Sequence, residues 1–206
     1  MNNFFNTAKK HILIKDMSGI IDFNVIDSEF NKLTFKKNVV NNISENIHFF
    51  DAPALADAKL ALENECISYL KNGYSVQQFQ SLEITHSWGN VTSPGEGHHD
   101  HNHPFSIVSG VLFVDDNLDN LNLHIETYMP EIPHFWYRKK SFISLKDLIG
   151  KPEGLKNHLV LFLSNTDHFV SQTEPTSVAR KSIAFNTFWK GIVGANEPGL
   201  GSYTFK

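Results

Sequence analysis

Four of the eleven histidines lie close together, in the run Gly97-His98-His99-Asp100-His101-Asn102-His103-Pro104. Histidine is the most common nitrogen ligand for iron, copper, zinc and nickel. Because alternate side chains of an extended backbone point to one side, His99, His101 and His103 could face a single ion. The run therefore indicates a metal centre. A solvated histidine-rich turn, or a tract that binds metals adventitiously, is the alternative explanation.

Residues later in the chain could complete a catalytic centre. An iron site of the facial type takes three protein ligands on one side and leaves positions open for cosubstrate and dioxygen. Ligands at i and i+2 on one strand leave the same face, so the third must come from a distant strand. His168, which follows the apolar run 159–163, is the candidate. Arg180 precedes Ser182, and a guanidinium with a nearby hydroxyl can bind a carboxylate.

The order of these pieces resembles the iron(II)/2-oxoglutarate-dependent oxygenase superfamily. The similarity is greatest to a branch of small oxygenases that carry Trp-x-Asn, then His-x-His-Pro, then Ser-Gly-Val. It covers roughly residues 82–190. The matching pieces are Trp88-Gly89-Asn90, His101-Asn102-His103-Pro104, Ser109-Gly110-Val111, Phe162-x-Ser164, His168 and Arg180-Lys181-Ser182.

The resemblance implies a double-stranded β-helix, or jelly roll, with iron(II) near its open end. It implies a dioxygenase that decarboxylates 2-oxoglutarate to succinate and uses dioxygen to hydroxylate an unidentified small-molecule or peptide substrate. The residues that match functional positions are His101, His103 and His168 for the metal, and Arg180, Ser182 and Asn90 for 2-oxoglutarate.

The sequence departs from the superfamily at the paired ligands. Most members have His-x-Asp or His-x-Glu, whereas His103 stands at the carboxylate position here. A site of three histidines has one less negative charge, which should weaken iron binding. A literal His-x-Asp exists as His98-His99-Asp100, so Asp100 is the alternative ligand. We favour His101 and His103 because they stand at the branch's distance from Ser109-Gly110-Val111.

A cupin-like metal protein is the alternative function, either as an enzyme that does not use 2-oxoglutarate or as a non-catalytic module. Arg180 and Ser182 discriminate between the two functions, because the cupin-like chemistry has no need of a carboxylate clamp. The sequence carries no signal for an oligomeric state.

The bulk composition predicts a single domain. At 206 residues the chain can bury one sizeable core, and we expect one oxygenase-like domain with an N-terminal extension over residues 1–50 and a core over about 75–192.

The formal charge of −4, without a basic cluster, argues against a nucleic-acid partner. No apolar run reaches the roughly 18 residues of a membrane span. The N-terminus does not resemble a signal peptide, and Cys66 is the single cysteine, so we expect a cytoplasmic protein.

The elements that would position these residues are mostly strands. Extended pieces are expected at 12–14, 20–26 and 33–35, and strands at 81–88, 107–114, 121–128, 159–163 and 182–189. A helix is expected from Asp51 and Pro53 to Gly73, because apolar residues recur at spacings of three and four, and a short helix is expected near 144–149. This order predicts a mainly β (α+β) fold, an antiparallel sandwich or barrel with an N-terminal helical buttress.

Three further features of the sequence lead to structural or functional predictions. Trp88 is expected to pack in the core, and His86 is expected to be a sheet histidine with its hydrogen bonds satisfied. The aromatic segment 128–137 is a candidate for substrate contact, because long loops often cover the mouth of a jelly roll.

Overall fold

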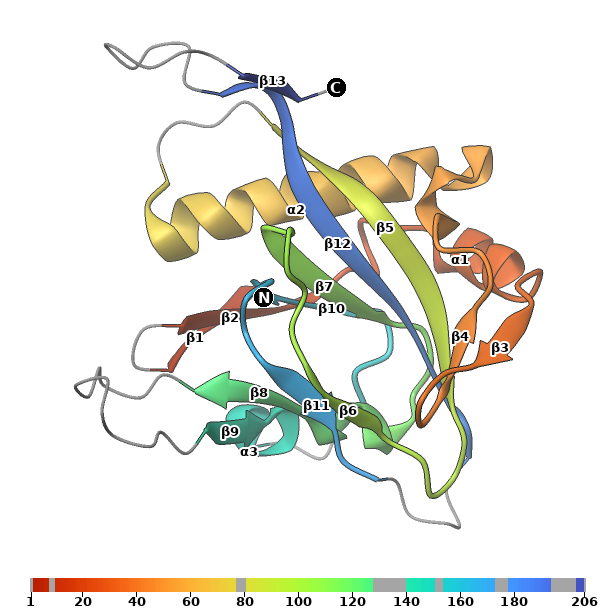
Figure 1. The fold of residues 1–206 in the computed structure, drawn as a ribbon. Coiled ribbons are helices and arrows are strands. Elements are labelled where there is room, and N and C mark those ends of the chain that lie inside the picture. Colours follow the sequence, from red (N-terminus) through yellow and green to blue (C-terminus); the bar gives the residue numbers. More distant parts are fainter. Residues whose placement is uncertain are drawn as a thin grey trace.

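Two antiparallel sheets face each other, and a long helix covers the outer face of the larger one (Figure 1). The computed structural model describes residues 2–7, 10–76, 81–127, 140–150, 154–172, 178–193 and 203–205. This arrangement is the jelly roll that the sequence predicts, mainly β with helical buttressing.

The larger sheet has the strand order β1-β2-β10-β7-β12-β5-β4-β3, and β13 pairs with β12. Its strands are β1 (Asn2–Thr7), β2 (Lys10–Asp16), β3 (Phe35–Lys37), β4 (Asn42–Ser44), β5 (Ser81–Thr92), β7 (Val108–Phe113), β10 (His158–Leu163), β12 (Arg180–Val193) and β13 (Tyr203–Phe205). Because β2 pairs with β10 and β4 pairs with β5, the N-terminal strands belong to the same sheet as the central ones.

The smaller sheet has the order β6-β11-β8-β9. Its strands are β6 (His98–His101), β8 (Leu123–Thr127), β9 (Ser141–Ser144) and β11 (His168–Val170). The helical segments are α1 (Phe23–Phe30), α2 (Ala56–Tyr74), α3 (Leu145–Ile149) and the 3-10 turns η1 (Phe49–Asp51), η2 (Pro53–Leu55) and η3 (Leu118–Asn122). No helix in the described parts of the chain is both long enough and apolar enough to span a membrane.

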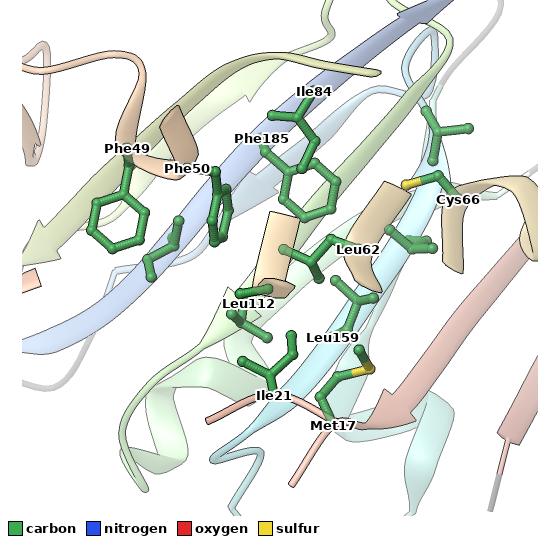
Figure 2. Close-up of a cluster of buried hydrophobic side chains, with 14 of the residues drawn as sticks. Met17, Ile21, Phe49, Phe50, Leu62, Cys66, Ile84, Leu112, Leu159 and Phe185 are labelled. Atoms are coloured by element: carbon green, nitrogen blue, oxygen red, sulfur yellow. The ribbon is translucent and has the colours of Figure 1, made fainter. Parts of the chain in front are cut away.

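The larger sheet buries both of its faces. On β10, Leu159 and Leu161 join the core beneath α2, whereas Val160 and Phe162 join the core beneath the smaller sheet. This alternation follows from the two-residue period of a strand. Figure 2 shows the first core, in which Leu159 lies with side chains of α2 and of the neighbouring strands.

Gly110 on β7 has a packing role in that core. It lies opposite Phe185 of β12 in the strand register, and a Cβ atom added to Gly110 would stand 2.2 Å from the Phe185 ring. Only glycine allows the ring to lie across the strand at this distance. The Ser-Gly-Val motif therefore includes a residue that is fixed by packing.

The long helix is confirmed, with changes at both ends. Asp51 lies in η1 rather than at the helix N-terminus, and Gly73 lies inside α2. Ser75 ends the helix in a left-handed conformation, with φ of 54°. The buried residues Leu62, Cys66 and Leu70 of α2 have the predicted spacing.

The extended piece predicted at 20–26 is wrong, because α1 begins at Phe23. The side chain of Asp22 accepts a hydrogen bond from the backbone nitrogen of Asn24 at 2.9 Å, which caps the helix. Ile26 and Phe30, four residues apart, are its buried residues. The apolar alternation at positions 21, 23 and 25 is typical of a strand, whereas the capping residue Asp22 indicates the start of a helix.

The later strands are confirmed with shifted ends. Residues 121 and 122 belong to η3 rather than to β8, and the strand predicted at 182–189 extends to both sides as β12. The third N-terminal piece begins at Phe35 instead of Leu33. The pairing of β12 with β5 runs from Arg180 opposite Thr92 to Lys190 opposite Ser81, with an irregularity between Asn186 and Thr187.

Candidate metal centre and cosubstrate pocket

Three imidazoles converge between the two sheets. His101 ends β6 and His168 begins β11, and the two residues are direct partners across these strands. His103 lies two residues beyond β6, where its backbone nitrogen donates to the Ser164 carbonyl at 2.9 Å. One ring nitrogen of each histidine lies within 4.8 Å of the other two. The structure thus brings together the three residues that are predicted from the sequence as metal ligands.

Hydrogen bonds orient two of these rings. Nδ1 of His101 lies 2.8 Å from the His99 carbonyl oxygen, and Nδ1 of His168 lies 3.0 Å from the Thr166 carbonyl oxygen. A carbonyl can only accept, so Nδ1 carries the proton and donates in both rings. In the neutral ring, Nε2 is then left with a free lone pair, which is the arrangement that metal-binding histidines use.

Burial keeps the imidazoles neutral. It lowers the pKa of His103 to about 4, and the nearby His101 adds to this effect. Burial also lowers the pKa of His168 far below its usual range, with His101 as the second cause. Neutral imidazoles are the form that coordinates a metal ion.

A network of polar residues joins the two segments that carry these histidines. Nζ of Lys140 lies 2.8 Å from an oxygen of Asp100 and 2.6 Å from an oxygen of Asp167. The side-chain nitrogen of Asn102 donates to Asp167 at 2.7 Å. Asp100 adjoins His101 and Asp167 adjoins His168 in the sequence. Asp100, the alternative ligand, is therefore engaged with Lys140 and lies outside the converging group.

The remaining two histidines of the run flank the converging group. The His98 ring stacks on His99 at a centroid distance of 4.7 Å and contacts His101 at 4.4 Å. Burial, followed by the charges of its histidine neighbours, lowers the pKa of His98 to about 3. His98 lines the pocket described below.

Arg180 lines the same pocket, and we call its part of the pocket the arginine end. Its side chain is 4% exposed, and Nη2 donates to the Thr92 hydroxyl at 3.3 Å. Nε of Arg180 is buried and has no hydrogen-bond partner among the described residues. Burial lowers the pKa of Arg180 to about 10, while Asp115 and Asp119 oppose this shift, so the guanidinium is charged at neutral pH. A buried cation with an unsatisfied donor is costly unless an anion accompanies it.

Asn90 and Ser182 lie beside Arg180 on the pocket face. They are direct partners across β5 and β12, so their side chains leave the sheet on the same side. Asn41 donates to the side-chain oxygen of Asn90 at 3.3 Å. Both Asn90 and Ser182 are buried and line the pocket.

The pocket opens to solvent. Its polar lining combines the converging histidines and the arginine end, and its apolar lining comes from both sheets. The lining residues are Asn41, Trp88, Asn90, His98, His101, His103, Ser109, Gly110, Val111, Leu123, Phe162, His168, Val170, Arg180, Ser182 and Ala184.

Some residues of the site differ from the sequence-based expectation. Trp88, predicted to pack in the core, is partly exposed and lines the pocket, with its ring 5.8 Å from that of His103. Thr92 and Lys140 had no signal in the sequence, because their roles depend on partners that are distant along the chain. The aromatic segment 128–137 lies outside the described residues.

Comparison with known families agrees with this geometry. A family model described as "Putative 2OG-Fe(II) oxygenase" matches residues 86–186. Residues 86–186 therefore match a domain of the 2OG-Fe(II) oxygenase family. The matched segment of this oxygenase domain includes the converging histidines and Arg180. No protein of curated function matches the sequence.

Several solved structures share the fold of this chain at low sequence identity. A 2OG-Fe(II) oxygenase family oxidoreductase from Burkholderia pseudomallei has a TM-score of 0.57 and 10% identity, over 85% of this chain and 83% of that one. HygX from Streptomyces hygroscopicus, with nickel, 2-oxoglutarate and hygromycin B bound, has a TM-score of 0.56 and 10% identity, over 87% and 83%. A prolyl hydroxylase from Trichoplax adhaerens, in complex with a peptide fragment, has a TM-score of 0.51 and 13% identity, over 86% and 83%.

The described residues fit iron(II) and 2-oxoglutarate, the metal and cosubstrate of this oxygenase family. Because Nδ1 donates in His101 and His168, Nε2 of each neutral ring carries the lone pair, which suits a divalent metal. The buried Nε of Arg180 lacks a partner, which suits an anionic group. Both ends line one pocket, so a single dicarboxylate between them would meet a metal and a cation.

Proposed function

We propose that this oxygenase is a hydroxylase whose iron(II) is held by His101, His103 and His168. The distal carboxylate of 2-oxoglutarate binds to Arg180 and Ser182, and Asn90 also touches the cosubstrate. The observation that carries the proposal is the buried guanidinium with an unsatisfied donor, placed in the same pocket as three converging imidazoles. A cupin-like protein that does not use 2-oxoglutarate would have no use for that cation.

The proposed overall reaction consumes 2-oxoglutarate, dioxygen and a substrate C–H bond, and it releases succinate, carbon dioxide and an alcohol. One oxygen atom of dioxygen enters succinate and the other enters the new hydroxyl group. Iron(II), when bound, supplies the redox chemistry that activates dioxygen. Because β2 and β4 pair with central strands, we also propose that residues 1–206 work as one domain.

The protein's own residues orient the reactants and exclude water. The guanidinium of Arg180 can donate two parallel hydrogen bonds to one carboxylate, and the Ser182 hydroxyl can add a third. The apolar side chains Val111, Leu123 and Phe162 also line the pocket that Arg180 and the histidines share. In such a lining, the charge–charge interaction between Arg180 and a carboxylate is stronger than in water.

Binding of iron and cosubstrate tests the proposal directly. Protein loaded with iron(II) under anaerobic conditions should develop a weak visible absorption band when 2-oxoglutarate is added. Exposure to air should then yield succinate in an amount that depends on both iron and dioxygen. Arg180→Met should lose the band and the succinate while it still binds iron(II).

Two results would count against the proposal. If the iron-loaded protein yields neither band nor succinate, a cupin-like metal module is favoured. If Asp100→Ala loses iron while His103→Ala retains it, the metal ligands are assigned wrongly. Measuring iron stoichiometry in both variants separates these outcomes.

A further inference from the structure

A second hollow adjoins the pocket, and we call it the side groove. It opens to solvent. Its described lining comes from the segment before η1, from β5 and β12, and from the turn between β6 and β7. The lining residues are Ile47, His86, Trp88, His103, Pro104, Phe105, Ser106 and Asn186.

The side groove and the pocket share one wall. Trp88 and His103 line both hollows. Along β12 and β5, the cross-strand pairs follow one another in the order Arg180–Thr92, Ser182–Asn90, Ala184–Trp88 and Asn186–His86. The first pairs lie at the arginine end and the last lies in the side groove. A molecule in the side groove would thus lie beside His103, on the side away from Arg180.

Phe105 lines the side groove in a strained backbone conformation. Its side chain is 94% exposed, and its backbone has φ of 62°, a left-handed conformation that bulky residues rarely adopt. Backbone hydrogen bonds fix both ends of this turn. His103 donates to the Ser164 carbonyl at 2.9 Å, and the Ile107 carbonyl accepts from the Ser164 nitrogen at 3.1 Å. Such strain at the edge of a reaction site is typical of a functional residue.

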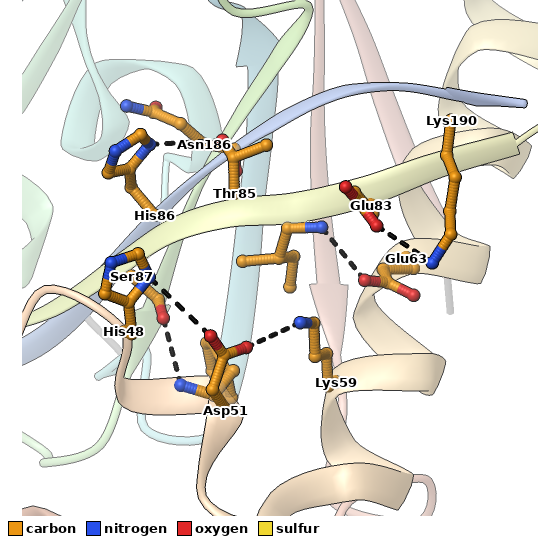
Figure 3. A network of polar contacts seen from close by, with 12 residues as sticks. His48, Asp51, Lys59, Glu63, Glu83, Thr85, His86, Ser87, Asn186 and Lys190 are labelled. Carbon is orange, nitrogen blue, oxygen red and sulfur yellow. Dashed lines mark hydrogen bonds and ion pairs between the residues drawn. The ribbon is translucent and has the colours of Figure 1, made fainter. Parts of the chain in front are cut away.

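The described lining of the side groove contains no Lys, Arg, Asp or Glu. It offers rings instead, from Trp88 and Phe105 and from His86, whose ring stacks on that of His48 at 5.7 Å (Figure 3). Asn186 adds a polar group: its side-chain oxygen accepts from the Ser109 hydroxyl at 2.7 Å, which leaves its amide nitrogen as a donor.

We propose that the side groove is the substrate site and that it binds an uncharged small molecule with an aromatic or alicyclic ring. The ring packs against Phe105 and Trp88, and a carbonyl or hydroxyl of the substrate accepts from Asn186. The described lining offers a charged group no oppositely charged Lys, Arg, Asp or Glu side chain, whereas its rings offer apolar contact. The assignment as substrate site rests on the proposed hydroxylase function, whereas the ring-binding property does not.

Calorimetric titration with 2-naphthol, an uncharged ring probe, tests this inference. The titration uses the protein with iron(II) and saturating 2-oxoglutarate under anaerobic conditions, and it is repeated without either. Phe105→Ala should weaken naphthol binding by about three- to tenfold, which is the range of one aromatic contact. Phe105→Trp should retain it. Leu60→Ala, which removes another exposed apolar side chain on α2, is the matched control and should have no effect.

Charged analogues and the cosubstrate define the site. Naphthalene-2-carboxylate and 2-naphthylmethylammonium should bind more weakly than naphthol when 2-oxoglutarate is present. The inference is overturned if naphthol does not bind, if Phe105→Ala leaves its affinity unchanged, if the charged analogues bind equally well, or if 2-oxoglutarate competes with it. If naphthol binds as expected but 2-oxoglutarate does not bind, the ring site stands and the proposed hydroxylase function fails.

Discussion

The two ends of the pocket are built very differently. Arg180 begins β12, which forms a long pair with β5 in the larger sheet, and its side chain is buried. The histidines stand where short strands of the smaller sheet begin and end, and His101 and His103 are partly exposed. The anion end is therefore set by the main framework of the fold. The metal end depends on local hydrogen bonds and on the Lys140 network.

The largest expected effect is at the metal end. His168→Ala removes the one converging histidine that is buried, whose Nδ1 donates to the Thr166 carbonyl and whose Nε2 carries the lone pair. We expect iron(II) affinity to fall by about a hundredfold or more, because one of three ligands is lost. Anaerobic iron titration measures this. His158→Ala, which changes a histidine outside the converging group, should bind iron like the unchanged protein; if both variants lose iron equally, the histidines are not acting as a specific site.

Arg180→Met tests the anion end alone. We expect 2-oxoglutarate affinity to fall by about a hundredfold, because charge-assisted hydrogen bonds are lost, while iron(II) affinity stays unchanged. The free protein should not be less stable, since the variant removes a buried cation with an unsatisfied donor. Calorimetry and thermal unfolding measure both quantities. A large loss of iron binding would show that the two ends are not independent.

Lys140→Met should act on the metal end without touching a ligand. We expect iron(II) affinity to fall by about tenfold, because the two histidine-bearing segments lose their shared ion pairs. The affinity for 2-oxoglutarate should change much less. Lys190→Met breaks a comparable surface ion pair with Glu83 (Figure 3) and is the control. Equal effects of the two substitutions would remove the special role of Lys140.

Ser182→Ala should have a smaller effect at the anion end. We expect 2-oxoglutarate affinity to fall by about tenfold, because one hydrogen bond from a neutral hydroxyl to the charged carboxylate is lost. Ser106→Ala, in the side groove, is the control, and titration of both variants with 2-oxoglutarate measures the difference. An unchanged affinity in Ser182→Ala would leave Arg180 as the sole anchor of the distal carboxylate.

The smallest expected effect concerns acid stability of the metal-free protein. The pKa of His103 is about 4 in the folded state, compared with about 6.5 when unfolded. The unfolded state therefore binds more protons between these values, so stability is lost as the pH falls below about 6.5. From pH 7 to pH 6, His103 should cost about 0.7 kcal/mol. Urea unfolding at both pH values should show a shallower pH dependence in His103→Asn; an equal dependence would mean that His103 is not held neutral by the fold.

The sequence predicts the candidate ligand and anchor residues of the site, but it does not predict the residues that hold their segments in place. His101, His103, His168 and Arg180 could be nominated because each has a recognisable chemistry and a place relative to a strand. Lys140 could not, because nothing near it in the sequence marks its approach to two distant carboxylates. Trp88 was misread because a large aromatic residue in a strand usually packs in a core, and only the register with β12 places it at the pocket.

The paired strands β5 and β12 set the distance between the two hollows. Arg180 lines one hollow and Asn186 lines the other on the same strand, about 20 Å apart at the usual rise of a strand. A one-residue insertion between them would turn one set of side chains to the opposite face, whereas a two-residue insertion would keep the face and lengthen the span by about 7 Å. If the two hollows have the proposed roles, an insertion beyond Ala184 would change the side groove and leave Arg180 in place.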